Sequence, residues 1–184
     1  MRRRLRKRAG KKQQPSLALV DSQSVQGGVH RGNGYDGGKK VNGRKRHILV
    51  DTLGLLLMVV VTKANVSDQR GLENILAALT GKLSRLKLLK ADQGYRGESF
   101  VARLEQSYGR TLEIVKRPEG VKGFQLLPQR WIVERTLAWV GNYRRLSKDY
   151  EVLPETSETF IYLAMVDLMT RRLAGCTTPA FKSK

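Results

Sequence analysis

Three acidic residues occupy positions where carboxylates can assemble into a metal site. Asp21 follows the short apolar run 17–20, Asp92 ends the strand-like run 86–92, and Glu134 lies in a helix-like segment with Arg130 and Trp131. Side chains at strand ends are held over a rigid frame, so two such carboxylates and a helical one could hold two divalent cations. Mg²⁺ suits an all-oxygen site, and two metal ions can activate the attacking oxygen and stabilise the leaving oxygen in phosphodiester chemistry.

Each of these acids also has an ordinary structural explanation. Asp21 and Asp92 could accept hydrogen bonds from their own backbone in Asx turns. Glu134 could pair with Arg130, one helical turn before it. Ala138 and Gly141 share the helix face of Glu134 and leave it room to meet another element, but the alternatives remain open at this point.

A glycine-rich segment carries a dense cluster of cations. Lys39, Lys40, Arg44, Lys45 and Arg46 are candidate contacts to phosphate groups, which position a duplex without reading its sequence. The alternative is a solvated loop. The three glycines of the segment 32–37 match the dinucleotide fingerprint in letters only, because a strand-like run follows them where that fingerprint requires a helix.

The carboxylates require a sheet that brings strand ends together. Apolar runs predict strands over 17–20, 46–50, 55–61, 86–92 and 112–115, with a hairpin turn at 51–54. Helical spacing and caps predict helices over 68–79, 98–108, 128–140 and 156–173. This order predicts an α/β fold, a mixed sheet with helices on both faces.

The composition favours a folded protein that binds a polyanion. The 184 residues carry a net charge of +19, and their hydrophobic share of 40% is too high for a disordered basic chain. Eight cations and no acid fall within residues 1–14, which leaves 27 basic against 16 acidic residues in the remainder. We therefore expect a disordered basic arm over 1–16, one domain over 17–174 and a C-terminal tail over 175–184.

The sequence also indicates the cellular compartment of the protein. Cys176 is the single cysteine and cannot form an internal disulfide, which favours a reducing compartment. The longest apolar run, 55–61, is far shorter than the roughly 18 residues of a membrane helix. A cytoplasmic protein without a membrane partner is expected, and nucleic acid is the leading partner for its positive charge.

Several segments closely resemble the catalytic domain of bacterial insertion-sequence transposases of the IS-four/IS-five type, over residues 17–174. They comprise Asp21-Ser22-Gln23-Ser24, the stretches 35–54 and 144–151, Ala91-Asp92-x-Gly94-Tyr95-Arg96-Gly97, and Arg130-Trp131-x-Val133-Glu134-Arg135-Thr136. The resemblance implies an RNase H-like fold and a DDE triad of Asp21, Asp92 and Glu134. It also implies two Mg²⁺ ions, with Mn²⁺ as a substitute.

The resemblance implies a reaction and partners as well. The reaction is hydrolysis at transposon ends, followed by attack of the freed 3′-hydroxyl on target DNA. The partners are double-stranded DNA at the bacterial nucleoid and further copies of the chain in a homodimer or higher multimer on that DNA. Arg130, Arg144, Arg145 and Lys148 are expected DNA contacts alongside the cations of the glycine-rich segment.

Two departures from the family pattern bear on these expectations. In the signature around the glutamate, the tyrosine position is Leu127 and the lysine position is Gly141, so Arg144 or Lys148 is a candidate to replace the lysine. Members also usually carry a helix-turn-helix DNA-binding segment before the first aspartate, where this chain has about 20 residues. We therefore expect the downstream frame of a split transposase, joined to an upstream DNA-binding segment, or a truncated copy.

Two other functions remain alternatives. A catalytically silent DNA-binding fragment could occupy transposon ends and regulate the full-length enzyme. A stand-alone RNase H-like nuclease would act on other nucleic acids without strand transfer.

Overall fold

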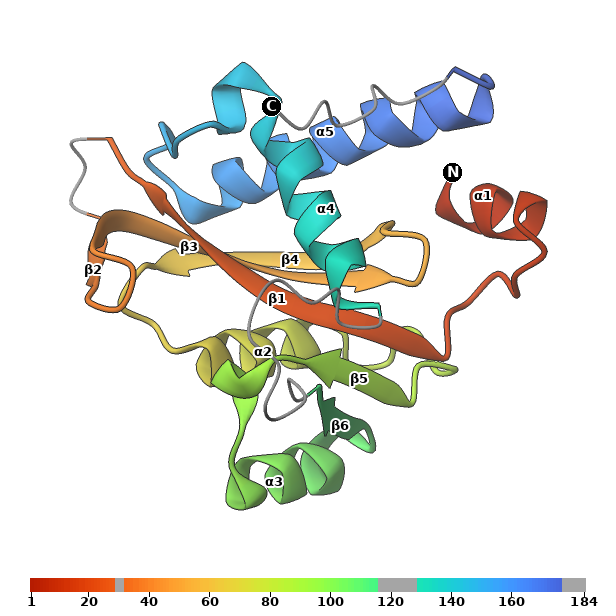
Figure 1. Cartoon of the computed structure of the whole chain (residues 1–184), viewed down its shortest axis with the longest axis horizontal. Coiled ribbons are helices and arrows are strands. Elements are labelled where there is room, and N and C mark those ends of the chain that lie inside the picture. Colours follow the sequence, from red (N-terminus) through yellow and green to blue (C-terminus); the bar gives the residue numbers. More distant parts are fainter. Residues whose placement is uncertain (29–31, 116–128, 177–184) are drawn as a thin grey trace, which may run out of the picture.

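A six-stranded mixed sheet forms the centre of the molecule, and helices cover both of its faces (Figure 1). The computed structural model describes residues 1–28, 32–115 and 129–176. The strands run in the order β2-β3-β1-β5-β6, and β4 pairs with β3. They comprise β1 (Leu17–Gln26), β2 (Gly34–Asp36), β3 (Val41–Asp51), β4 (Leu56–Lys63), β5 (Leu88–Ala91) and β6 (Thr111–Ile114). The predicted fold class is confirmed.

The helices divide between the two faces of the sheet. Helices α2 (Asp68–Ala78) and α3 (Glu98–Tyr108) lie on one face, whereas α4 (Arg130–Gly141) and α5 (Pro154–Leu173) lie on the other (Figure 1). Two short 3₁₀ helices, η1 (Gln93–Tyr95) and η2 (Arg144–Leu146), follow β5 and α4. The predicted start of the third long helix at Pro128, and the signature position Leu127, lie outside the described residues.

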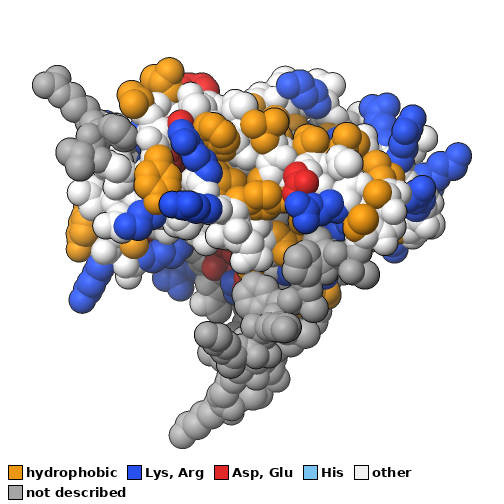
Figure 2. All heavy atoms as spheres, turned by 90° about the horizontal axis from the view of Figure 1, so that it is seen from above, with side chains coloured by type: hydrophobic (Ala, Val, Ile, Leu, Met, Phe, Trp, Pro, Cys, Tyr) orange, Lys and Arg blue, Asp and Glu red, His pale blue; other side chains and the backbone are white. Residues whose placement is uncertain are grey.

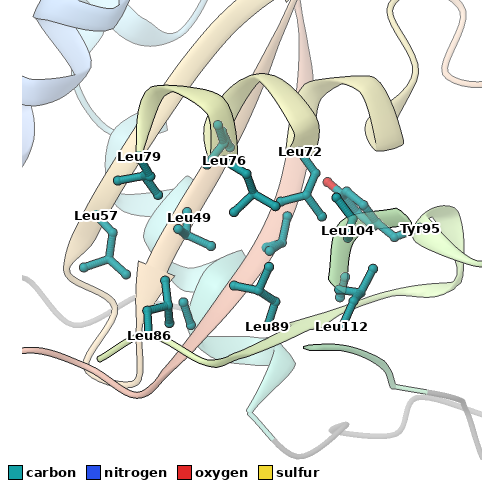
Figure 3. Packing of buried hydrophobic residues seen from close by; sticks show 14 of the residues in the cluster. Leu49, Leu57, Leu72, Leu76, Leu79, Leu86, Leu89, Tyr95, Leu104 and Leu112 are labelled. Atoms are coloured by element: carbon teal, nitrogen blue, oxygen red, sulfur yellow. The ribbon is translucent and has the colours of Figure 1, made fainter. Parts of the chain in front are cut away.

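The sheet is buried on both sides because the side chains of its central strand alternate between two cores. Ala18 and Val20 of β1 pack with Leu72 of α2 in one core, which Figure 3 shows from close by. Leu19 packs with Val133 of α4 in the other core. Strands covered on both faces are apolar on both faces, which explains the continuous apolar run at the start of β1.

Strand β1 continues beyond the expected run 17–20 to Gln26. Its polar second half pairs antiparallel with β3, with Ser22 opposite His47 and Gln26 opposite Gly43. The sequence predicts a loop here because these residues lack an apolar pattern. Pairing with a long neighbouring strand stabilises the extended backbone regardless of that pattern.

The first residues of the chain form helix α1 (Arg2–Arg8), where we expected a disordered arm. The guanidinium of Arg6 lies 2.6 Å from the carboxylate of Asp51, and both side chains are at most 5% exposed. Asp51 also accepts hydrogen bonds from the backbone N–H groups of Leu53 and Leu55 in the turn between β3 and β4. The arm is therefore fixed to the sheet by a long-range buried ion pair that composition does not reveal.

We predict that Arg6→Met destabilises the protein by about 3 kcal/mol or more, because removing one partner of a buried ion pair leaves the other charge unpaired. The matched control is Lys7→Met, on the exposed side of the same helix. Urea unfolding followed by circular dichroism measures both variants. Equal stability of the two would show that the Arg6–Asp51 pair does not hold the arm.

His47 of β3 is fully buried beneath α2. A β-carbon added at Gly71 of α2 would collide with the imidazole, so the helix packs here through a bare backbone. The imidazole Nε2 lies 3.0 Å from the hydroxyl of Thr62. Burial lowers the pKa of His47 to about 4, against a small opposing effect of Asp68, and the folded protein therefore keeps this ring neutral.

The buried imidazole predicts a pH-dependent stability. In the unfolded chain His47 titrates near pH 6.5, so its contribution is fully present above that pH and is lost as the pH falls toward 4, by about 3 kcal/mol in all. His47→Gln should flatten this part of the profile, measured as the difference in unfolding free energy between the two proteins at pH 7, 6, 5 and 4. Parallel profiles for the two proteins would contradict the assignment.

Candidate active site

The pairing of β1 with β5 brings two of the expected acids together. The strands run parallel, with Leu17 opposite Leu88 and Leu19 opposite Lys90. Extending this register by two residues places Asp21 opposite Asp92, on the face of the sheet that α4 covers. Asp92 caps η1 by accepting the backbone N–H of Gly94 at 2.9 Å, so the Asx turn that we considered is present as well.

The environment of Asp21 disfavours the charged form of its carboxyl group. Burial raises its pKa to about 6, and the nearby carboxylate of Asp92 adds to this effect. The backbone N–H of Ser22 donates to Asp21 at 2.8 Å, and the more distant charges of Arg130 and Lys39 lower the pKa less than burial raises it. A cation beside both carboxylates would remove the cost of holding two negative charges together.

Helix α4 contributes the third acid and a bridging cation. The guanidinium of Arg130 lies 3.1 Å from Glu134, one turn further along the helix, and 3.8 Å from Asp92. Arg130 therefore connects the helical carboxylate to the strand-end carboxylate. The intrahelical pair that we considered for Glu134 exists, and it lies next to the aspartate pair rather than apart from it.

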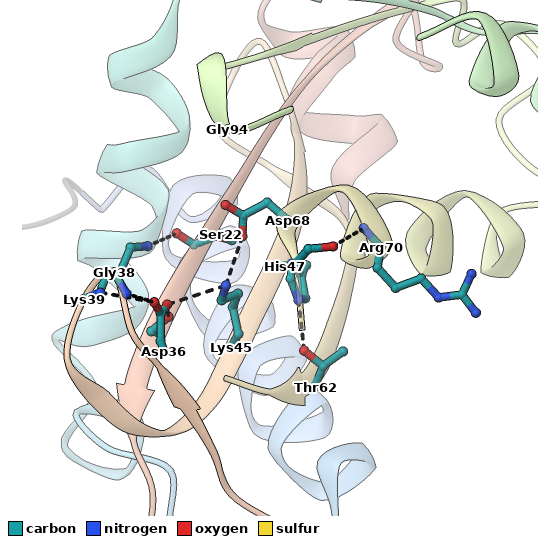
Figure 4. Close-up of polar contacts among 12 residues, drawn as sticks. Ser22, Asp36, Gly38, Lys39, Lys45, His47, Thr62, Asp68, Arg70 and Gly94 are labelled. Atoms are coloured by element: carbon teal, nitrogen blue, oxygen red, sulfur yellow. Dashed lines mark hydrogen bonds and ion pairs between the residues drawn. The ribbon is translucent and has the colours of Figure 1, made fainter. Parts of the chain in front are cut away.

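A fourth carboxylate lies on the opposite side of β1, which the sequence did not indicate. Asp68, the first residue of α2, accepts a hydrogen bond from the hydroxyl of Ser22 at 2.7 Å and pairs with Lys45 at 3.3 Å (Figure 4). A β-carbon at Gly94 would lie 3.0 Å from an oxygen of Asp92 and 3.2 Å from an oxygen of Asp68. The bare backbone of Gly94 thus separates two carboxylates that are far apart in the sequence.

The structure buries three of the cations that we expected to touch DNA. Arg44 donates to the carbonyl of Val152 at 2.6 Å, and Arg46 donates to the carbonyl of Leu146 at 2.8 Å; each is 1% exposed. Lys45, 7% exposed, pairs with Asp36 and Asp68. Both faces of β3 are covered at this point, so these side chains fix neighbouring segments and are not available to a ligand. Their assignment as DNA contacts is corrected.

The remaining candidate DNA contacts are exposed, except for the partly buried Arg130. Lys39 and Lys40 follow β2. Arg144 and Arg145 of η2 and Lys148 follow α4, and the guanidinium of Arg145 is engaged with Glu151 at 2.8 Å and with the ring of Phe160. Exposed cations thus follow β2 and α4, and among them the charge of Lys39 acts on Asp21.

The carboxylates supply a donor set that suits a hard divalent cation. Asp21 and Asp92 present only oxygen atoms, and the site favours added positive charge because of the burial described above. Across residues 1–28, 32–115 and 129–176, no three His, Cys, Asp or Glu side chains stand close enough to form a ready-made metal cluster. Glu134 is turned toward Arg130, so two of the three expected ligands are brought together and the third lies beside them.

Comparisons with known proteins identify relatives of this arrangement. The model of the transposase DDE domain family matches residues 12–166. A putative transposase for insertion sequence element IS402 from Burkholderia cepacia is 31% identical over 129 residues, which are 66% of this chain and 60% of that protein. The chain therefore spans less than two thirds of the length of this curated relative.

Two solved structures share the fold at low identity. A chain of the piggyBac transposase synaptic complex with hairpin DNA matches with a TM-score of 0.51 and 10% identity, over 90% of this chain and 50% of that one. A chain of the simian T-cell lymphotropic virus intasome in complex with PP2A regulatory subunit B56 gamma matches with a TM-score of 0.50 and 17% identity, over 83% and 48%. The sheet and its helices therefore have the RNase H-like fold that these two chains share. No helix in the described part of the chain is long and apolar enough to cross a membrane.

We predict that Asp21→Asn and Asp92→Asn each weaken Mn²⁺ binding by about tenfold or more, because affinity for a hard cation depends on the number of charged ligands. Glu155→Gln, an exposed acid at the start of α5, is the matched control and should leave the affinity unchanged. Isothermal titration calorimetry on the folded variants gives the constants. Comparable affinities for all three variants would place the ion elsewhere.

Proposed function

Because the chain belongs to the transposase DDE domain family, we propose that it cuts transposon ends and joins them to target DNA by metal-dependent phosphoryl transfer. The observation that carries the proposal is the parallel register of β1 and β5, which sets Asp21, in the middle of β1, beside Asp92, the residue directly after β5. Family membership favours this activity over a stand-alone nuclease or a silent DNA-binding fragment.

The proposed ligands are Asp21, Asp92 and Glu134, and the proposed ions are two Mg²⁺, for which Mn²⁺ can substitute. Such ions, when bound, lower the pKa of a coordinated water and stabilise the developing charge on the leaving oxygen. The chain's own contribution is to hold Asp21 and Asp92 on a rigid sheet. Their side chains keep this position before any ligand arrives, which reduces the entropic cost of assembling the site.

Arg130 is proposed as the residue that positions the acids on the α4 side. It contacts Asp92 and Glu134 at once, so it sets the distance between helix and strand end. Its guanidinium is also suited to a scissile phosphate, because it presents several N–H donors in a fixed plane. If Arg130 exchanged its partner Glu134 for a phosphate group, the carboxylate of Glu134 would be free to bind a metal ion.

The proposed substrate is double-stranded DNA, both the transposon ends and the target. Support comes from the family and from the exposed cations Lys39, Lys40, Arg144, Arg145 and Lys148, of which Lys39 acts on the charge of Asp21. These residues would contact phosphates without reading bases. Lys148 or Arg144 is the proposed replacement for the family's signature lysine, since Gly141 has no side chain.

We further propose that the protein acts as a homodimer or higher multimer on DNA, in the cytoplasm at the bacterial nucleoid, together with an upstream DNA-binding segment. The name of the piggyBac structure, a synaptic complex with DNA, is consistent with such an assembly.

Asp92→Ala is predicted to lower Mg²⁺-dependent strand cleavage by about 1,000-fold or more, equivalent to about 4 kcal/mol of lost transition-state stabilisation. Duplex binding should persist, because the substitution removes a negative charge and no cation. The assay uses a labelled transposon-end duplex and the chain supplied with its upstream segment, with Glu155→Ala as the control. Cleavage by the Asp92→Ala protein at the control's rate would refute the assignment.

A further inference from the structure

A second basic surface lies at the end of the sheet opposite the carboxylates. We define the arm surface by six residues of the first segment and of the loop before β5: Arg3, Lys7, Lys11, Lys12, Lys82 and Arg85. Arg3 and Lys7 stand one turn apart on α1, so their side chains project from the same side of the helix. Figure 2 shows blue side chains gathered over this end of the molecule.

The structure holds these charges in place. Arg6 is fixed by Asp51, Arg2 donates to the carbonyl of Leu56 at 3.2 Å, and Arg8 donates to the carbonyl of Leu173 at 2.5 Å. The arm thus contacts the β3–β4 hairpin and the end of α5. Arg2 and Arg6, one turn apart, anchor one side of α1, Arg8 anchors its last turn, and Arg3 and Lys7 remain exposed.

The surface is hollowed on both sides of the arm. One cavity of about 320 Å³ is lined by the side chains of Arg6, Lys11, Lys12 and Arg85, among others. A second of about 490 Å³ has Arg3 and Lys82 in its wall. Arg85 donates to the carbonyl of Gln14 at 3.5 Å, so the segment that separates the hollows is attached to the loop before β5. Cations from two distant parts of the sequence therefore line concave sites.

Negative charge is missing from this region. Residues 1–20 and 79–87 contain no Asp or Glu, and Asp51 beneath them is buried against Arg6. Within the described ranges, none of the six side chains forms an ion pair with a carboxylate. Like charges held together without counter-charges repel one another, and a polyanion that releases their counterions relieves this repulsion.

We propose that the arm surface binds the phosphate backbone of duplex DNA at a place separate from the carboxylate site. Strands rise by about 3.3 Å per residue, so Leu17, where β1 leaves the arm, lies about 13 Å from Asp21 along the strand. A duplex bound at the carboxylates reaches the arm surface if it extends along the sheet. If it does not, the arm surface binds a second duplex. This inference does not depend on the carboxylates being catalytic.

The test compares two triple variants of the whole chain that lose the same charge. The arm variant carries Lys7→Gln, Lys11→Gln and Lys12→Gln, all exposed and away from the anchoring contacts. The control variant carries Lys63→Gln, Arg70→Gln and Arg103→Gln, exposed positions on β4, α2 and α3. Thermal unfolding first shows that both are folded. Fluorescence anisotropy without divalent cations then gives the affinity for a mixed-sequence duplex over a series of salt concentrations.

The arm variant should bind duplex DNA about tenfold more weakly near 100 mM salt. Its negative slope of log K against log salt should become shallower by about 2 to 3, since each phosphate contact contributes about 0.9 to the steepness. The control should change the affinity by less than about threefold and keep the slope. Equal losses in both variants would mean that only net charge matters and would overturn the proposal.

A membrane is the competing polyanionic partner and is tested in parallel. Vesicles of phosphatidylserine and phosphatidylcholine are mixed with the same two variants. If the arm variant loses vesicle binding but keeps its affinity for DNA, the proposal is wrong. Because these measurements contain no cleavage step, an inactive carboxylate site leaves their outcome unaffected, and the two proposals fail or succeed separately.

Discussion

The parallel pairing of β1 with β5 is the contact on which the site depends. Only three residue pairs define its register, from Leu17–Leu88 to Leu19–Lys90, yet that register determines that Asp21 lies opposite Asp92. A shift by one residue would turn Asp21 or Asp92 to the other face of the sheet. The apolar residues of the two strands are buried between α2 and α4, so the cores on both faces oppose such a shift.

The cations of the chain have two roles, one structural and one on the surface, and the net charge does not distinguish them. Arg6, Arg44 and Arg46 are buried, and they bind a carboxylate or backbone carbonyls that join segments far apart in the sequence. The exposed cations form separate groups, one after β2 and α4 and one on the arm. The +19 charge is therefore a poor measure of the surface available to DNA, and the location of each cation decides its role.

Local patterns in the sequence predicted the elements and the two acids that follow apolar runs. Asp21 and Asp92 could be identified because each follows an apolar run. The expectation that both end a strand was wrong for Asp21, because β1 continues to Gln26. Residues whose environment comes from distant contacts could not be predicted. Arg46 is fixed by a carbonyl 100 residues away and Arg6 by a carboxylate 45 residues away, so the first was expected on DNA and the second in a disordered arm. Asp68 lies near Asp92 only because α2 packs beside Gly94.

The central claim is that Asp21 and Asp92 form one metal site. Anomalous diffraction from crystals soaked in Mn²⁺ tests it most directly, because the scattering of the ion identifies its position without reference to activity. The account predicts an anomalous peak within coordination distance of a carboxylate oxygen of both Asp21 and Asp92. A peak bound to other residues, with the two aspartates left without metal, would contradict it.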